Sequence, residues 1–241
     1  QWTRRLARLL ARSRPADRLL APAVSRIQVL PYQLEPAIAM ALDGVPRLLV
    51  ADAVGLGKTI QAGIAMLELR LRRLADRILV LTPAGLRYQW AREIRRRFHL
   101  DCSVVDAPAL ATLRTLHPAT VNPWSVPRIA IASFDFVKRV DVEPGVADVA
   151  WDLVVIDEAH LAAGGTARGA TAHRLASNAA HVLLLSATPH RGDDEAYAAV
   201  CALGSVDPPR RVRPRQEPAA PLVVFRRTRA DVGLAANRHV H

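Results

Sequence analysis

The residues best suited to chemistry lie in two short segments, each following an apolar run. The first is Asp52–Thr59, which reads Asp-Ala-Val-Gly-Leu-Gly-Lys-Thr. Backbone N–H groups can bind phosphate oxygens only where side chains leave room, and Gly55 and Gly57 leave that room. Lys58 can reach the β- and γ-phosphates of a nucleotide, and the Thr59 hydroxyl can ligate Mg²⁺. The segment predicts a phosphate-binding loop, with nucleotide contacts from Asp52, Val54, Gly55, Leu56, Gly57, Lys58 and Thr59.

Two adjacent acids follow the second apolar run, Leu153–Ile156. Asp157 would end a strand at the carboxyl edge of a sheet, where α/β proteins gather their ligands. There it would hold Mg²⁺, and Glu158 would orient and deprotonate an attacking water. An ordinary helix cap is the alternative, and it leaves the pairing with a phosphate-binding loop unexplained. Lys58, Asp157 and Glu158 are therefore the predicted catalytic residues of an ATP hydrolase.

A third segment, Ser186–His190, follows the apolar run Val182–Leu185. Small hydroxyl side chains at a strand end can hydrogen-bond both the acidic loop and a moving neighbour. We expect Ser186 and Thr188 to act as such coupling residues. On its own the segment would be an unremarkable turn.

Short β-rich runs position these segments and alternate with helical patterns. The runs are Leu48–Ala51, Ile78–Leu81, Ser103–Val105, Ile129–Ala132, Leu153–Ile156, Val182–Leu185 and Leu222–Phe225. Several are apolar at consecutive positions, as in strands covered on both faces. Apolar residues recur at helical spacing over Thr59–Ala75, while Ala107–Pro127 reads as loop with a short helix over Leu110–Leu116. The alternation predicts an α/β fold with a mainly parallel, doubly wound sheet and helices on both faces.

Composition bounds the class of protein. The 241 residues are 51% hydrophobic, which suits one large domain or two small ones, and no apolar run approaches a membrane span. Cys102 and Cys201 have no metal or redox spacing, so we expect a reducing cytoplasm. The net charge of +11 suggests a polyanionic partner, with solvated surface charge as the alternative. Lysine occurs only at Lys58 and Lys138, so arginine dominates that charge.

Four regions are expected along the chain. Residues 1–25 form a basic helical extension, and residues 26–203 form the nucleotide-binding lobe. Residues 204–221 are a connector rich in proline and arginine. Residues 222–241 contain the last strand and an exit segment.

In order, these motifs resemble those of superfamily 2 helicase-related ATPases. Within that superfamily the chain is most similar to the Swi/Snf-like branch, especially bacterial members near the RNA-polymerase-recycling ATPase. The likeness rests on Pro31–Pro36, which looks like the adenine-reading glutamine motif, and on the extended loop-helix sequence Gly55–Gly63. It also rests on Leu81–Trp90, which resembles motif Ia, and on Phe225–Val232, which resembles the segment leaving the first motor lobe.

The resemblance implies a RecA-like P-loop NTPase lobe that uses ATP and Mg²⁺, with a DEAH-type acidic motif. Gln33 would read the adenine edge, Tyr32 would pack beside it, and His160 would link the nucleotide site to motif III. Nucleic-acid phosphates would be gripped by Thr82, Pro83, Gln89, Trp90, Ser133 and Phe134. Taken singly, Trp90 and Phe134 fit core aromatics better than base-stacking groups, and Arg92, Arg95 and Arg96 either extend the track or form a solvated face.

The resemblance also predicts a partner lobe. Members of this branch usually carry an acid where Ala53 stands, and a second RecA-like lobe supplies further arginines to the γ-phosphate. Because the 241 residues do not include such a lobe, we expect this piece alone to bind ATP weakly and hydrolyse it poorly.

The predicted function is the ATP-binding lobe of a DNA translocase that moves on duplex DNA without sequence preference, in the bacterial cytoplasm at the nucleoid. A DEAH-type DNA or RNA helicase lobe is one alternative. A regulatory nucleic-acid-binding module without turnover is the other.

Overall fold

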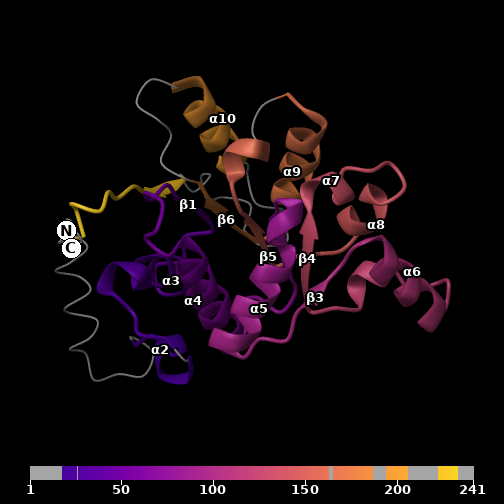
Figure 1. The fold of residues 1–241 in the computed structure, drawn as a ribbon, viewed down its shortest axis with the longest axis horizontal. Helices are drawn as coiled ribbons and strands as arrows, with labels where there is room; N and C mark the ends of the chain where they lie inside the picture. The colour runs from indigo at the N-terminus through magenta and orange to yellow at the C-terminus, as the bar shows by residue number, and fades with distance from the viewer. Residues whose placement is uncertain (1–17, 26, 163–164, 187–193, 206–221, 233–241) are drawn as a thin grey trace, which may run out of the picture.

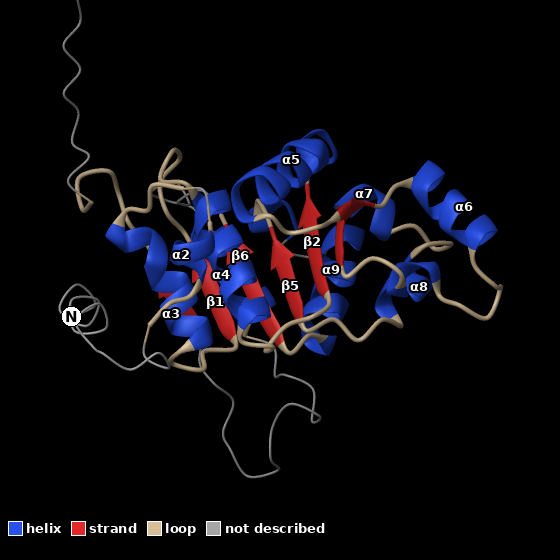
Figure 2. Ribbon diagram, turned by 90° about the horizontal axis from the view of Figure 1, so that it is seen from below, coloured by secondary structure: helices blue, strands red, loops and turns tan. Residues whose placement is uncertain are grey.

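Seven parallel strands form the centre of the molecule, and helices cover both faces of the sheet (Figures 1 and 2). The computed structural model describes residues 18–25, 27–162, 165–186, 194–205 and 222–232. The strands are β1 (Arg47–Val50), β2 (Ile78–Thr82), β3 (Ser103–Val104), β4 (Ile129–Ser133), β5 (Leu153–Ile156), β6 (His181–Leu185) and β7 (Val223–Phe225). Every pairing between them is parallel, which confirms the predicted sheet.

Each of the seven apolar runs is a strand, with ends that differ from the prediction by at most one residue. The strand order is β3-β4-β2-β5-β6-β1-β7. Every residue of β1, β2, β4 and β5 is buried, because helices cover both sides of these strands. Strands β3 and β7 lie at the two edges and are shorter and more exposed.

Two helical layers pack on the sheet, each with its own apolar cluster. One layer contains α2 (Ala21–Val24), α3 (Glu35–Ala41), α4 (Lys58–Leu71) and α5 (Arg87–Phe98). The opposite layer contains α6 (Ala107–Leu116), α7 (Phe134–Val137), α8 (Glu143–Ala147), α9 (Ala167–Asn178) and α10 (Asp194–Gly204). Short 3-10 turns complete the chain: η2 (Pro31–Leu34), η3 (Ala84–Leu86), η4 (Pro123–Ser125) and η5 (Ala159–Ala162).

The region expected to be loop after β3 begins with a full helix instead. Helix α6 starts at Ala107, because the Asp106 carboxylate accepts a hydrogen bond from the Ala109 N–H at 3.1 Å. Pro108 lies in its first turn, where proline's missing N–H costs nothing. The prolines of this region therefore mark a helix start that the sequence reading placed three residues too late.

Parts of the predicted extension and connector lie outside the described residues, namely 1–17 and 206–221. The short helix α2 belongs to the predicted extension, and buried Glu68 of α4 holds it. The Glu68 Oε2 atom accepts hydrogen bonds from the Leu20 and Ala21 N–H groups at 2.8 and 2.7 Å. Within the described ranges, no helix has the length and apolar character needed to cross a bilayer.

A glycine permits the close packing of α4 against α5. A Cβ atom at Gly63 would lie 2.1 Å from Cε2 of Phe98, whose ring is buried and cannot swing aside. We expect Gly63→Ala to destabilise the protein by about 1–3 kcal/mol, even though alanine favours helix, because overpacking exceeds that gain. Urea denaturation measures the change.

Gly85→Ala is the matched control, since nothing lies within 4 Å of a Cβ atom there. We expect it to change the free energy of unfolding by less than about 0.5 kcal/mol. A Gly63→Ala protein as stable as the original would show that α4 and α5 do not pack this closely.

Candidate active site

The two chemical segments meet at one edge of the sheet. Strand β6 lies between β1 and β5, with Val50 in register with Leu185 and Ile156 with Leu184. The chain therefore leaves β1 toward Asp52 and leaves β5 toward Asp157 at the same carboxyl edge, two strand spacings or about 10 Å apart. A nucleotide site shared by the two segments needs both of them at the same edge.

The loop after β1 has the backbone shape of an anion cradle. Gly55 and Gly57 have φ of +89° and +76°, a region that side chains disfavour. Gly57 is also the residue before α4, whose positive end points at the loop. Among the described residues, no protein acceptor takes the N–H groups of Gly55, Gly57, Lys58 or Thr59. The loop thus offers unused donors to a bound phosphate.

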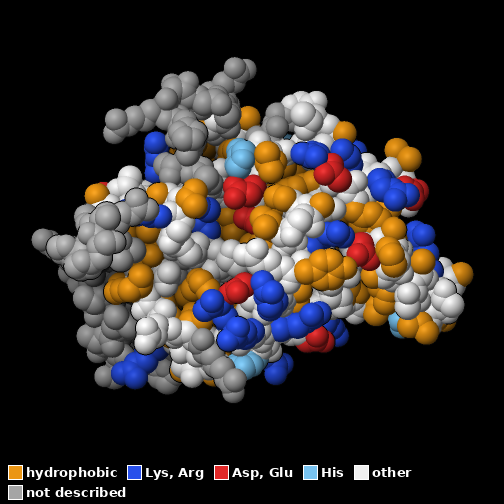
Figure 3. Space-filling model, in the orientation of Figure 1, with side chains coloured by type: hydrophobic (Ala, Val, Ile, Leu, Met, Phe, Trp, Pro, Cys, Tyr) orange, Lys and Arg blue, Asp and Glu red, His pale blue; other side chains and the backbone are white. Residues whose placement is uncertain are grey.

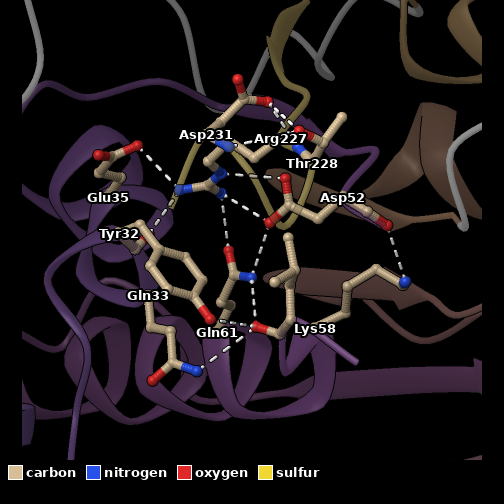
Figure 4. A network of polar contacts seen from close by, with 10 residues as sticks. Tyr32, Gln33, Glu35, Asp52, Lys58, Gln61, Arg227, Thr228 and Asp231 are labelled. Atoms are coloured by element: carbon tan, nitrogen blue, oxygen red, sulfur yellow. Dashed lines mark hydrogen bonds and ion pairs between the residues drawn. The ribbon is translucent and has the colours of Figure 1, made fainter. Parts of the chain in front are cut away.

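Three side chains hold the shape of this loop by donating to one of its carbonyl groups. The Leu56 oxygen receives the Tyr32 hydroxyl at 3.2 Å and the Gln33 and Gln61 amides at 3.4 Å each (Figure 4). Lys58 turns back onto the Asp52 carbonyl at 3.0 Å. Of the predicted nucleotide contacts, Tyr32, Gln33 and Leu56 have buried side chains that support the loop.

The predicted adenine-reading group is engaged within the protein. The other end of the Gln33 amide accepts the Leu30 N–H at 3.1 Å. A Cβ atom at Gly57 would lie 2.8 Å from Gln33 Nε2, so this glycine also makes room for the amide. Val54, by contrast, is 70% exposed at the tip of the loop.

Buried partners fix the first acid. The Trp90 indole N–H donates to Asp157 Oδ2 at 2.7 Å, and the Thr82 hydroxyl donates to the same oxygen at 3.1 Å. Burial raises the pKa of Asp157, and the two hydrogen bonds oppose that shift by favouring the carboxylate. The oxygen Oδ1 accepts the Glu158 N–H at 3.0 Å.

The second acid has an unusual backbone. Glu158 has φ of +48°, one of three non-glycine residues with positive φ in the described chain. Its Oε2 atom lies 3.5 Å from His160 Nδ1, and that nitrogen lies 3.3 Å from the Ser186 hydroxyl at the end of β6. His160 and Ser186 thus contact each other as coupling residues would, whereas Thr188 lies outside the described residues.

The predicted nucleic-acid contacts divide by exposure. The side chains of Thr82, Trp90, Ser133 and Phe134 are all buried, so none can grip a phosphate at the surface as expected. Thr82 and Trp90 instead hold Asp157, and Ser133 caps α7 by accepting the Phe136 N–H at 3.3 Å. Phe134 is a core aromatic, which was the alternative reading. Only Pro83 and Gln89 remain accessible.

Exposed arginines lie beside this accessible part. Arg92, Arg95 and Arg96 are exposed on α5, and Lys and Arg side chains gather over this helix on the face drawn in Figure 3. The helix follows η3, which contains the exposed Ala84 and Gly85. Arg92, Arg95 and Arg96 thus form a positively charged strip on α5.

Arg227 is the residue that sequence reasoning missed. It follows β7 and places its guanidinium between Tyr32, Glu35, Asp52 and Gln61 (Figure 4). Asp52 was expected to face the nucleotide, but its carboxylate is fully buried against this arginine. A buried acid at the end of β1 requires a cation, but the arginine that supplies it is set by the pairing of β7 with β1.

Comparisons with a family model and with curated relatives point to the same family. The model of the SNF2-related domain matches residues 39–202. RNA polymerase-associated protein RapA of Yersinia enterocolitica is 37% identical over 190 residues, which is 77% of this chain and 19% of the relative. RapA of Serratia proteamaculans is 35% identical over 179 residues, or 72% of this chain and 18% of the relative. The chain thus spans about a fifth of the length of these curated relatives.

Solved structures share the fold. The Sulfolobus solfataricus SWI2/SNF2 ATPase core in complex with dsDNA superposes with a TM-score of 0.69 and 18% identity, over 90% of this chain and 48% of that one. The Pyrococcus furiosus Hef helicase domain gives 0.62 and 20%, over 86% and 39% of the two chains. These likenesses confirm the predicted RecA-like α/β fold.

Proposed function

The chain belongs to the SNF2-related family, and on that premise we propose that it is the ATP-binding lobe of an ATP-dependent DNA translocase. One observation carries the proposal. A loop with unused N–H donors follows β1, and a pair of adjacent acids follows β5, at the same edge of the sheet.

The residues at this edge suit ATP and Mg²⁺. The N–H groups of Gly55–Thr59 would bind the phosphates, and Lys58 would turn from the Asp52 carbonyl to the β- and γ-phosphates. Thr59 and Asp157 would hold the metal ion, which neutralises charge on the phosphates when bound. Glu158 would take a proton from the attacking water. His160, which contacts both Glu158 and Ser186, would couple the nucleotide site to the segment after β6.

Duplex DNA is the proposed track. The related Sulfolobus core was solved with dsDNA, and the positively charged strip of α5 offers phosphate contacts without base readout. Binding through Arg92, Arg95 and Arg96 would be nearly independent of sequence and would weaken as salt rises. Pro83 and Gln89 would lie beside the same strand.

A second RecA-like lobe is the proposed partner. Charge supplied from such a lobe can raise the rate of phosphoryl transfer by about a thousandfold or more. We therefore propose that these 241 residues alone hydrolyse ATP poorly.

A helicase lobe is the second candidate, favoured by the structural likeness to the Hef helicase domain. A translocase displaces the third strand of a DNA triplex without separating the duplex, whereas a helicase releases a duplex strand. We expect duplex DNA to stimulate ATP hydrolysis by the full-length protein and triplex displacement to follow. Strand separation without triplex displacement would favour the helicase, and ATP binding without hydrolysis would favour a regulatory module.

The hydrogen bond from Trp90 gives a prediction for the metal site. Trp90→Phe keeps most of the ring volume but removes the N–H that holds Asp157 Oδ2. Because partners that orient a metal ligand contribute roughly 10–100-fold to affinity, we expect the Mg²⁺ needed for nucleotide binding to rise about tenfold. Titration of Mg²⁺ against a fluorescent ATP analogue measures this. Trp124→Phe makes the same change at another buried tryptophan, whose ring centre lies 6.1 Å from that of Phe136, and should leave the Mg²⁺ requirement unchanged.

A further inference from the structure

The Arg227 guanidinium uses all of its donor directions on acceptors within the protein. Nε and Nη2 form a fork on the two oxygens of Asp52, each at 2.9 Å. Nη1 reaches the Tyr32 carbonyl at 2.6 Å and Glu35 Oε2 at 2.9 Å, and Nη2 also reaches Gln61 Oε1 at 2.9 Å. The group further lies 5.3 and 5.1 Å from the ring centres of Tyr32 and Phe225.

These acceptors surround the phosphate-binding loop. Asp52 begins the loop, Gln61 lies in the first turns of α4, and Tyr32 precedes α3. Gln61 and Tyr32 also donate to the Leu56 carbonyl, in the middle of the loop. Arg227 therefore hydrogen-bonds directly to Tyr32 and Gln61, two of the three residues that donate to the Leu56 carbonyl, as Figure 4 shows.

The backbone of the same segment runs beside the loop. The Ala51 N–H donates to the Phe225 carbonyl at 2.7 Å, and the Ala53 N–H donates to the Arg227 carbonyl at 2.9 Å. Arg229 then reaches the Val54 carbonyl at 3.3 Å. Residues 225–229 and 51–54 thus form one unit, although they lie far apart in the sequence.

The charges of Asp52 and Glu35 make Arg227 difficult to replace with another residue. Asp52 is fully buried, and both of its carboxylate oxygens accept hydrogen bonds or ion pairs from Arg227 and Gln61. Glu35 is also largely shielded, and burial raises its pKa while Arg227 opposes the shift. Lysine carries the same charge but cannot make the fork, so it would leave several of these acceptors without a donor.

We infer that Arg227 is a positioning residue of the nucleotide site, which sets the shape of the phosphate-binding loop and links it to the segment after β7. The inference rests on the proposed function. Because coupling between two sites is reciprocal, nucleotide in the loop must also change the stability of residues 225–232.

The test compares Arg227→Lys with Arg226→Lys, the same change at the exposed neighbour. Binding of a fluorescent ATP analogue with Mg²⁺ is measured at a temperature where circular dichroism shows each protein folded. We expect Arg227→Lys to weaken binding about tenfold or more, as loss of an orienting partner does, and Arg226→Lys to leave it unchanged.

Hydrogen exchange supplies a readout that does not need bound nucleotide. In Arg227→Lys without nucleotide, we expect the amides of Ala53 and Leu56, which donate hydrogen bonds to the Arg227 and Ala53 carbonyls, to exchange faster than in the original protein. In the original protein, nucleotide should slow exchange over residues 225–232, and this effect should be lost in the variant. Should Arg227→Lys fail to fold, Gln61→Ala cuts the link from Arg227 to Leu56 more gently and should shift exchange of the same loop.

The outcomes separate the two proposals. An original protein that binds no nucleotide would overturn the proposed function. Hydrogen exchange of the loop amides without nucleotide would still test whether Arg227 holds the loop. A variant with a lower melting temperature but unchanged affinity and loop exchange would make Arg227 a structural residue only. That result would overturn the inference and leave the proposed function intact.

Discussion

Glu158→Gln should lower the ATPase rate of the full-length protein about a thousandfold, because a positioned general base contributes roughly 10²–10⁴-fold to catalysis. Glutamine keeps the size of the side chain and cannot accept the proton of the attacking water. Affinity for ATP should stay within a few-fold of the original, since this group acts on the water and not on the phosphates. Phosphate release with duplex DNA present measures the rate.

Glu143→Gln provides the control, because it makes the same chemical change on α8, where Glu143 pairs with Arg174 at 3.1 Å. Its ATPase rate should match that of the original protein. If Glu158→Gln kept full activity, another group would have to activate the water, and the role assigned to this residue would be wrong.

Lys58→Ala should weaken ATP binding about a hundredfold, because hydrogen bonds to charged groups contribute roughly 1.5–3 kcal/mol and this lysine would make more than one. Hydrolysis should fall below detection as well, since the same charge stabilises the transferring phosphoryl group. The fold should survive, because within the described part of the chain the Lys58 ammonium donates only to the Asp52 carbonyl. Titration with a fluorescent ATP analogue measures the affinity.

Lys138→Ala is a matched control within the same chain, since it removes the second of the two lysines. Lys138 pairs with Asp135 at 2.8 Å on the surface and lies in no part of the proposed site. Its loss should leave ATP affinity unchanged. Equal effects from the two variants would mean that overall charge, and not the phosphate-binding loop, governs binding.

Much of the fold was predictable from local patterns. Runs such as Leu48–Ala51 and Leu153–Ile156 are apolar at consecutive positions, and their short length favours strands buried on both faces over helices. Gly55 and Gly57 specify the loop directly, because its backbone needs positive φ. Helix α6 was misjudged at its start, since Asp106 and Pro108 were read as loop residues and not as a cap and a first turn.

The support around the site was harder to predict, because it depends on strand order. Nothing in a local pattern places β7 beside β1, so the meeting of Arg227 with Asp52 could not be read from either segment. The same limit applies to Trp90 and Thr82, which were assigned to nucleic acid by motif. Their contact with Asp157 follows from β2 lying next to β5. The loops at the strand ends were thus easier to locate from the sequence than the buried residues that hold them.

The left-handed backbone of Glu158 has a practical consequence for protein engineering. Such a conformation costs a non-glycine residue about 1–3 kcal/mol, and glycine or asparagine would relieve it. A screen that rewards only a higher melting temperature would therefore select these replacements and, if Glu158 has the role proposed above, abolish ATP hydrolysis. Thermostabilised libraries of this protein should keep position 158 fixed.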